Sequence, residues 1–393
     1  MVDNFVKQLL HPLSQQDFFS TYFEKKHLHI ESKQSDRFSD ILSFETLDSV
    51  LGQHALDSNS LRVVNSEKEF DVSQYTWNRG KVDAIKVAKF FAEGATIIFN
   101  HLQNHVSELN ELCNNISTDI NRKTQTNIYL TPANSQGFKT HWDTHDVFIM
   151  QVEGSKVWKI YKEHFKFPFD PDKHGFEPGV IDANNIIDEF VLNAGDILYI
   201  PRGIMHSASS TDSKSLHITF GIMPYTITEV VRDCLDIACE DIVDWRSEVP
   251  YGVKSESDLR ELITQKMTDI VNDSTLAKAL KRHDVRVKSN HRPFNSHYLQ
   301  EAINPTKLKF EDRILPYKHA QIHIVESDDK TKLHLDDGEK EIILPITAKK
   351  TIDLIFKSSD LKIGDFDDDV DWQSRKVVIS KVLKEGFAYR KRA

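Results

Sequence analysis

The hydrophobic residues between positions 126 and 223 fall in short runs rich in β-branched and aromatic side chains. Gly, Pro, Asn and Asp, which favour turns, separate these runs. The runs are residues 126–132, 147–161, 189–201 and 215–223. A series of short strands with turn residues between them predicts an antiparallel barrel or sandwich.

Two turn signals stand at the end of this pattern. Asn193-Ala194-Gly195-Asp196 lies between two hydrophobic runs and predicts a tight turn. Pro201-Arg202-Gly203 ends the second of these runs shortly before His206. The pattern therefore predicts a hairpin that delivers His206, with Arg202 fixing the turn or forming an ion pair.

Helical periodicity dominates elsewhere. Residues 101–120 carry apolar side chains at three- and four-residue steps, which predicts an amphipathic helix packed on a sheet. Residues 226–283 repeat this pattern and predict a helical bundle. The first 95 or so residues mix short helical and strand patterns typical of a cap, and the last ninety mix both kinds of element.

Composition narrows the function only slightly. The chain has 393 residues and a net charge of −10, so no overall positive field would draw it to nucleic acid, and we expect no direct nucleic-acid binding. Cys113, Cys234 and Cys239 are odd in number and lack zinc-site spacing. Neither a signal peptide nor a run of roughly 18 apolar residues is evident, which favours a cytoplasmic protein.

His141 and Asp143 form an H-x-D motif. A strand places alternate side chains on one face, so both are expected to point into the barrel. With His206 on a facing strand, they match the 2-His-1-carboxylate triad of non-haem Fe(II) oxygenases. The sequence therefore predicts a catalytic Fe(II) bound by these three residues, with open positions for a 2-oxo acid cosubstrate and O2.

An H-x-D motif alone is weak evidence, because an isolated strand histidine is more often a hydrogen-bonded core residue. His145 lies on the same alternation and is an alternative ligand, but no acidic residue follows it two positions on. His141 is therefore the preferred ligand. Trp142 stands between the two ligands and is expected to pack away from the metal.

The segments 127–161, 189–208 and 215–220 closely resemble the ribosomal oxygenases, a JmjC subfamily that hydroxylates ribosomal-protein side chains. The resemblance covers about residues 125–222 and places the family's iron ligands on His141, Asp143 and His206. It implies a mainly β double-stranded β-helix, the cupin or JmjC jelly roll, with flanking helices in residues 1–225. By the same resemblance, residues 226–300 form a helical dimerisation domain and residues 301–393 an α+β winged-helix-like domain.

The resemblance also implies a site for 2-oxoglutarate. Lys156 matches the family's basic residue that pairs with the distal carboxylate, and a buried lysine needs such a counter-charge. The alternative for Lys156 is a solvent-facing strand residue beside Lys159. Asn127 and Tyr129 match residues near the cosubstrate, although either could serve the fold alone. Thr219 alternates with His217 and Ser215, and one of these three is expected to hydrogen-bond in the pocket.

These features predict a homodimeric, Fe(II)- and 2-oxoglutarate-dependent protein hydroxylase acting on an arginine or histidine of a ribosomal protein. One alternative keeps this chemistry with another protein or a biosynthetic peptide as substrate. Another is a non-catalytic cupin-like binding protein, which the complete triad and Lys156 disfavour. Histone lysine demethylation is disfavoured because nothing resembles a chromatin-reading module.

Overall fold

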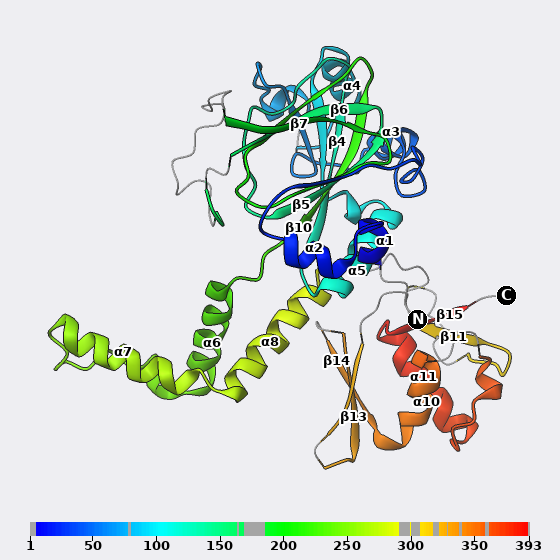
Figure 1. The fold of residues 1–393 in the computed structure, drawn as a ribbon. Helices are drawn as coiled ribbons and strands as arrows, with labels where there is room; N and C mark the ends of the chain where they lie inside the picture. Colours follow the sequence, from blue (N-terminus) through cyan, green and yellow to red (C-terminus); the bar gives the residue numbers. More distant parts are fainter. Residues whose placement is uncertain are drawn as a thin grey trace. The chain divides into compact units, whose positions relative to one another are not determined.

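The structure, a computed structural model, describes residues 5–77, 80–162, 165–168, 185–290, 299, 307–316, 322–327, 329–337, 340–357 and 361–391. It divides after Pro224 into two units, which are described separately below (Figure 1). The first unit contains α1 (Phe5–Leu10), α2 (Gln15–Thr21), β1 (Leu28–Ile30), α3 (Phe44–Gly52), β2 (Leu61–Val64), η1 (Val72–Gln74), α4 (Ala84–Ala92), β3 (Thr96–Asn100), η2 (Leu102–Asn104), α5 (Ser107–Ile120), β4 (Thr124–Thr131), β5 (Asp146–Glu153), β6 (Ser155–Tyr161), β7 (Ile186–Asn193), β8 (Ile197–Ile200), β9 (His206–Ser210) and β10 (Ser215–Ile222).

Two antiparallel sheets build this unit. The larger has the strand order β1-β8-β5-β10-β4-β3-β2, and the smaller has the order β7-β6-β9. Side chains from both sheets share one buried cluster, in which Val147 and Ile149 of β5 meet Trp158 and Ile160 of β6. Because the inward faces of the two sheets pack together, the predicted cupin-type jelly roll is confirmed.

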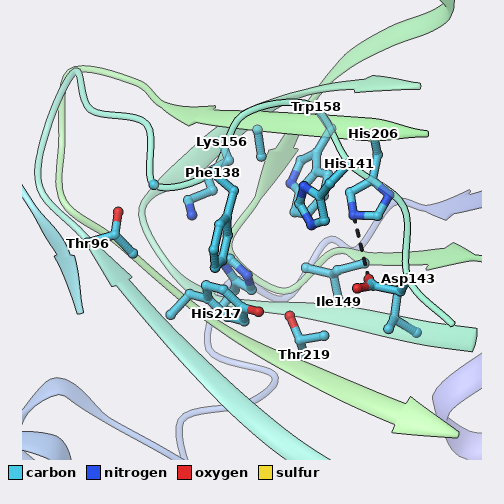
Figure 2. Close-up of a pocket in the computed structure, with 14 residues that line it drawn as sticks. Thr96, Phe138, His141, Asp143, Ile149, Lys156, Trp158, His206, His217 and Thr219 are labelled. Atoms are coloured by element: carbon cyan, nitrogen blue, oxygen red, sulfur yellow. Dashed lines mark ion pairs between the residues drawn. The ribbon is translucent and has the colours of Figure 1, made fainter. Parts of the chain in front are cut away.

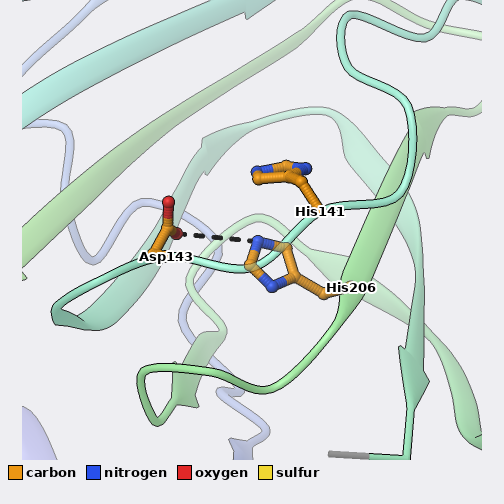
Figure 3. Close-up of side chains that lie close together, drawn as sticks. All are labelled: His141, Asp143 and His206. Carbon is orange, nitrogen blue, oxygen red and sulfur yellow. Dashed lines mark ion pairs between the residues drawn. The ribbon is translucent and has the colours of Figure 1, made fainter. Parts of the chain in front are cut away.

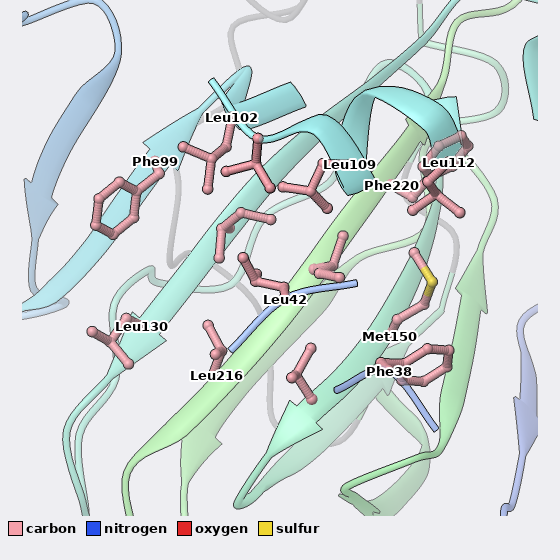
Figure 4. Close-up of a cluster of buried hydrophobic side chains, with 14 of the residues drawn as sticks. Phe38, Leu42, Phe99, Leu102, Leu109, Leu112, Leu130, Met150, Leu216 and Phe220 are labelled. Carbon is pink, nitrogen blue, oxygen red and sulfur yellow. The ribbon is translucent and has the colours of Figure 1, made fainter. Parts of the chain in front are cut away.

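Helices cover the other face of the larger sheet. Leu109 and Leu112 of α5 belong to the same buried cluster as Leu130 of β4 and Leu216 of β10 (Figure 4). The predicted packing of this helix on a sheet is therefore correct. The helix begins only at Ser107, since a short 3-10 turn, η2, precedes it.

The predicted hairpin before His206 is wrong. Strand β7 pairs with β6 in the smaller sheet, whereas β8 pairs with β1 and β5 in the larger one. The turn at residues 193–196 therefore carries the chain from one sheet to the other, and residues 201–205 carry it back to β9. Turn residues do not reveal which strands will pair, so the sequence did not distinguish a crossing from a hairpin.

The amino-terminal hundred residues do more than cap the barrel. They supply β1, which pairs with β8, and the strands β2 and β3, which extend the sheet beyond β4. Phe18 of α2 is buried and contacts Phe148 and Tyr199, with ring centroids 5.5 and 4.9 Å apart. The first unit therefore depends on this segment for its sheet and its core.

The second unit contains α6 (Ile227–Asp241), η5 (Val243–Arg246), α7 (Glu256–Ile270), α8 (Asp273–Lys288), β11 (Arg313–Pro316), β12 (His323–Glu326), β13 (Lys332–Asp336), β14 (Glu341–Pro345), η6 (Ile346–Ala348), α10 (Lys349–Lys357), η7 (Ile363–Asp365), α11 (Trp372–Lys384) and β15 (Ala388–Lys391). The helices α6–α8 share a small buried cluster that includes Cys234, Ile237 and Ile270. A separate cluster joins Leu335 and Ile342 of the β12-β13-β14 sheet to helical residues such as Ile379. Two hydrophobic cores agree with the predicted order of a helical segment followed by an α+β segment.

The boundary predicted near residue 300 lies outside the described residues. All three cysteines are free thiols, and Cys113 and Cys234 are buried. Within the described ranges, the helices are too short or too polar to cross a membrane.

Candidate metal and cosubstrate site

His141, Asp143 and His206 come together where the loop before β5 meets the start of β9. One ligand atom from each residue lies within 4.8 Å of the other two. Nε2 of His206 is 3.7 Å from Oδ2 of Asp143, and the two imidazole centroids are 4.5 Å apart (Figure 3). Within the described part of the chain, these three residues are the cluster with metal-ligand spacing.

The backbone fixes the two histidines directly. The N–H of His141 donates to the carbonyl of His206 at 3.1 Å, and the N–H of His206 donates to the carbonyl of His141 at 2.8 Å. His206 opens β9, whereas His141 forms an isolated bridge and Asp143 lies in the loop before β5. The prediction that His141 and Asp143 belong to a regular strand is therefore wrong, although their extended backbone still brings both to the site.

A hydrogen bond selects the tautomer of each imidazole. Nδ1 of His141 is 2.9 Å from the carbonyl of Lys139, and Nδ1 of His206 is 3.0 Å from the carbonyl of Ile204. Since a carbonyl oxygen only accepts, each Nδ1 carries the proton. Both Nε2 lone pairs are therefore available to a metal, the usual arrangement around ligating histidines.

The protonation states also suit a metal. Burial opposes the ionisation of Asp143, but the neighbouring His141 and His206 outweigh it and lower the pKa of this carboxyl. Burial, reinforced by His141, lowers the pKa of His206. An ionised carboxylate and a neutral imidazole, which these shifts favour for Asp143 and His206, are the forms that bind divalent metals.

His145 has a different position. Its ring lies against Gly221 of β10, so close that a Cβ at Gly221 would stand 2.7 Å from Cδ2 of His145. Among the groups that change the pKa of Asp143, His145 has the smallest effect. The structure thus leaves His145 outside the cluster of ligand atoms.

A cavity between the two sheets extends from the metal ligands. Figure 2 shows these ligands at one side of the cavity and Thr96 at the other, with Phe138 and Lys156 between them. The residues lining it come from both sheets and from the loop before His141: Thr96, Tyr129, Gly137, Phe138, His141, Asp143, Val147, Ile149, Lys156, Trp158, His206, Ala208, His217 and Thr219.

Lys156 is buried in this cavity. Its exposed fraction is 4%, so the alternative of a solvent-facing lysine is wrong. Lys159, by contrast, is partly exposed and lies 3.8 Å from Glu189. Among the described residues, none forms an ion pair or hydrogen bond with the Lys156 ammonium, and burial lowers its pKa to about 7. A buried ammonium without a counter-charge is costly, so this site favours an anionic ligand.

His217 and Trp158 form a second polar feature of the cavity. His217 is 2% exposed and stacks on Tyr129, with ring centroids 4.8 Å apart. In the described region, Nδ1 of His217 and Nε1 of Trp158 are buried without a hydrogen-bond partner. Buried polar groups are normally paired, so two unpaired groups beside Lys156 also indicate a polar ligand.

The remaining predicted residues divide. Tyr129 and Thr219 line the cavity, and burial, with a smaller effect of Asp143, raises the pKa of Tyr129. Asn127 pairs with Thr219 across β4 and β10 and shares the inward face of β4 with Tyr129. However, its Oδ1 accepts from the N–H of His101 at 3.2 Å, and it is not among the lining residues. A cosubstrate contact for Asn127 stays a prediction.

Sequence reasoning missed part of the cavity wall. The alternation of residues 215–219 included His217 without selecting it, and the alternation along β6 could have placed Trp158 beside Lys156. Thr96 and Phe138 gave no such signal, since they reach the cavity from an outer strand and a loop. Trp142 is buried against Tyr161 and Met205, as its predicted packing role requires.

Comparison with known proteins agrees with this geometry. Residues 100–230 match the family model of the JmjC domain. The bifunctional lysine-specific demethylase and histidyl-hydroxylase NO66 of Dictyostelium discoideum is 31% identical over 256 residues, which cover 63% of this chain and 49% of that protein. The corresponding protein of Drosophila melanogaster is 30% identical over 78% of this chain and 47% of its own length. The chain thus spans about half the length of these relatives.

Solved structures show the same fold along nearly the whole chain. The Escherichia coli ribosomal oxygenase YcfD aligns with a TM-score of 0.56 and 14% identity over 96% of this chain and 98% of that one. A structure of YcfD with cobalt and 2-oxoglutarate aligns with a TM-score of 0.54 and 14% identity over 97% and 99%. At this identity, the likeness establishes the fold.

Proposed function

From the JmjC domain at residues 100–230, we propose that this protein is an Fe(II)- and 2-oxoglutarate-dependent hydroxylase of a ribosomal-protein side chain. The observation that carries the proposal is the buried, unpaired Lys156 in the same cavity as the three metal ligands. Three metal ligands alone are compatible with many reactions. Three metal ligands beside a buried cation favour a cosubstrate that chelates the metal and also carries a negative charge at its other end.

The donor set suits Fe(II). Two imidazole nitrogens and one carboxylate on one side of the metal are the ligands of non-haem Fe(II) oxygenases. Fe(II), with 2-oxoglutarate and O2, supplies oxidative decarboxylation of the cosubstrate coupled to hydroxylation of an unactivated C–H bond. The chain itself holds His141 and His206 in the required tautomer through the carbonyls of Lys139 and Ile204.

The cavity suits a dicarboxylate. Lys156 would pair with the distal carboxylate, and this pairing would restore the ammonium charge that burial disfavours. Tyr129 and Thr219 offer hydroxyl groups in the same cavity. The apolar side chains of Ile149 and Trp158 exclude water from the space between Lys156 and the metal ligands, which strengthens each polar contact there.

The substrate proposal rests on relatives. The NO66 proteins are named histidyl-hydroxylases and YcfD is named a ribosomal oxygenase, so a ribosomal-protein residue, histidine or arginine, is the proposed target. Because the NO66 name also includes a lysine-specific demethylase, methyl-lysine is a second candidate for the same metal site.

The test is incubation of the purified protein with Fe(II), 2-oxoglutarate and ribosomes, followed by mass spectrometry of each ribosomal protein. Hydroxylation adds the mass of one oxygen atom to one side chain, and tandem spectra identify that residue. His141→Ala is the inactive control.

Loss of a methylene mass from methyl-lysine peptides would support demethylation instead. If neither change appeared while 2-oxoglutarate was still consumed, the ribosomal substrate would be rejected and a biosynthetic peptide or another protein would become the leading candidate. Absence of consumption would favour a non-catalytic binding protein.

We further propose that α6–α8 form a homodimer interface. The described helices expose apolar side chains, with exposed fractions of 80% for Ile227, 52% for Ile263 and 56% for Leu280. Light scattering after size-exclusion chromatography tests this proposal, and a monomer at micromolar concentration would contradict it. We also propose that the chain has three domains, that residues 301–393 form a winged-helix-like domain and that the protein is located in the cytoplasm.

A further inference from the structure

Glu24 joins the amino-terminal segment to the turn that presents His206. Its carboxylate Oε1 accepts from Nε of Arg202 at 3.1 Å and from Nη2 at 2.8 Å. The Arg202 side chain is only 10% exposed, and its guanidinium also lies over the ring of Phe167 at 4.9 Å. The pair is therefore better protected from solvent screening than an ordinary surface salt bridge.

The backbone of Glu24 is held in an unusual conformation. Its φ of +53° is in the left-handed region, which is unfavourable for a residue with a Cβ. The N–H of Glu24 donates to the hydroxyl of Tyr199 at 2.9 Å, and Tyr199 is fully buried. Such a conformation persists only where surrounding contacts determine it, so the contact with Tyr199 helps to fix the backbone from which the Glu24 side chain reaches Arg202.

Hydrogen bonds from Tyr199 continue to the start of β5, which follows Asp143, and from there to the turn that precedes His206. The hydroxyl of Tyr199 also hydrogen-bonds the buried carboxyl of Asp146, the first residue of β5. Asp146 Oδ1 accepts from the backbone N–H of Arg202 at 2.9 Å. Glu24, Tyr199, Asp146 and Arg202 thus form one connected network, which we call the clamp.

The clamp ends at the iron ligands. The N–H of Gly203, next to Arg202, donates to the carbonyl of Asp143 at 3.0 Å. The carbonyl of Ile204, one residue further, fixes the ring of His206. A displacement of the turn at residues 201–204 would therefore move two things at once. It would shift the backbone of Asp143, and it would shift the Ile204 carbonyl that orients the ring of His206.

We infer that Glu24 is a positioning residue for the metal site, acting through Arg202 and the turn at residues 201–204. The inference rests on the proposed iron site and assigns the amino-terminal segment a part in metal affinity. Glu24 touches neither metal nor substrate. Its effect is to hold the turn in place, so that the Ile204 carbonyl orients the ring of His206 and Gly203 stays hydrogen-bonded to the carbonyl of Asp143.

The experiment is a Co(II) titration of the full-length protein, followed by the visible absorption of the bound metal. Glu24→Gly removes the side chain but suits the left-handed backbone, so it separates the ion pair from backbone strain. Glu24→Gln keeps the shape without the charge. Removal of partners that orient metal ligands typically weakens affinity by 10- to 100-fold, and we expect about tenfold for both variants together with an altered absorption spectrum.

The matched control is Lys214→Ala. Lys214 pairs with Glu153 at 2.8 Å, a comparable distance, but away from the metal ligands. Its Co(II) affinity and spectrum should equal those of the natural protein. Arg202→Gln should resemble Glu24→Gln, and the double variant should be no worse than either single variant, because the two act through one contact.

The outcomes separate the two proposals. If the natural protein bound Co(II) without needing His141, the iron site itself would fail. If it bound through His141 but Glu24→Gly and Glu24→Gln kept the natural affinity and spectrum, the positioning role would be rejected. A lowered melting temperature with unchanged Co(II) binding would likewise reduce the clamp to a structural contact. If Glu24→Gly did not fold, Glu24→Gln and Arg202→Gln would decide.

Discussion

Lys156 and His206 are held on adjacent strands of the same three-stranded sheet. His206 lies opposite Ile160 in the pairing of β9 with β6, and Lys156 stands four residues before Ile160. Four strand residues span about 13 Å along β6. Since both side chains point into one cavity, the pairing register fixes the separation between the cation and the metal ligand.

The first prediction concerns the choice of metal ligands. Asp143→Ala should abolish Co(II) binding and turnover, because one of three ligands is lost and the two histidines remain without their anionic partner. Isothermal titration with Co(II) measures the affinity. His145→Ala is the matched control and should bind Co(II) normally. Loss of binding in the His145 variant, with binding kept in His141→Ala, would exchange the roles of these two histidines.

The second prediction separates cosubstrate from metal. Lys156→Met keeps the length and apolar stem of the side chain but removes the charge, so Co(II) affinity should stay unchanged while 2-oxoglutarate binding weakens. A hydrogen bond to a charged group contributes about 1.5–3 kcal/mol, which corresponds to about ten- to hundredfold in Kd. Titration of the Co(II)-loaded protein with 2-oxoglutarate gives this constant. An unchanged Kd would remove Lys156 from the cosubstrate site.

The third prediction is a pH dependence of cosubstrate binding. The pKa of Lys156 is about 7 in the empty protein, so the neutral amine predominates above that pH. Pairing with a carboxylate requires the charged form, and binding above pH 7 must therefore take up a proton. The Kd of 2-oxoglutarate should rise with pH, approaching about tenfold per unit. Lys156→Arg stays charged and should show a much weaker rise over the same range. A flat profile in the natural protein would contradict the prediction.

The fourth prediction tests the turn before His206. Gly203 has a φ of +83°, and a Cβ there would stand 1.9 Å from the carbonyl oxygen of Phe165. Gly203→Ala should lower the free energy of unfolding by about 1–3 kcal/mol and weaken Co(II) binding, because the turn must move. Chemical denaturation and metal titration measure the two effects.

Gly52→Ala is the control for this change. No atom lies within 4 Å of a Cβ at Gly52, the last residue of α3. It should leave metal binding unchanged and stabilise the fold slightly, by about 0.4–1 kcal/mol. Equal behaviour of the two alanine variants would show that the Gly203 turn tolerates a side chain.

The sequence predicted those features that depend on local periodicity. Alternating residues identified the barrel strands, three- and four-residue steps identified α5, and the H-x-D motif together with His206 selected three residues that lie close together. The burial of Lys156 was expected only from family resemblance, since alternation along β6 does not say which face is inside. The strand and helix predictions succeeded because each depends on neighbours in the chain.

Features that depend on distant pairing were not predictable. The crossing of the chain between sheets at residues 193–196 uses the same residue types as a hairpin turn. Phe138 reaches the cavity through a loop whose course depends on Thr96, against which Gly137 packs closely. The contact of Glu24 with Arg202 joins residues 178 positions apart, and no local pattern encodes such a pairing.

The larger sheet includes strands that lie outside the segment matched by the JmjC family model. The matched JmjC segment begins at residue 100, yet β1, β2 and nearly all of β3 precede it. An excised segment 100–230 would present the unpaired backbone of β4 and β8, where β3 and β1 belong. Exposed strand edges of this kind recruit other chains and aggregate. The segment that matches the family model is therefore smaller than the sheet whose strands pair around it, and the strands that complete this sheet come from residues before that segment.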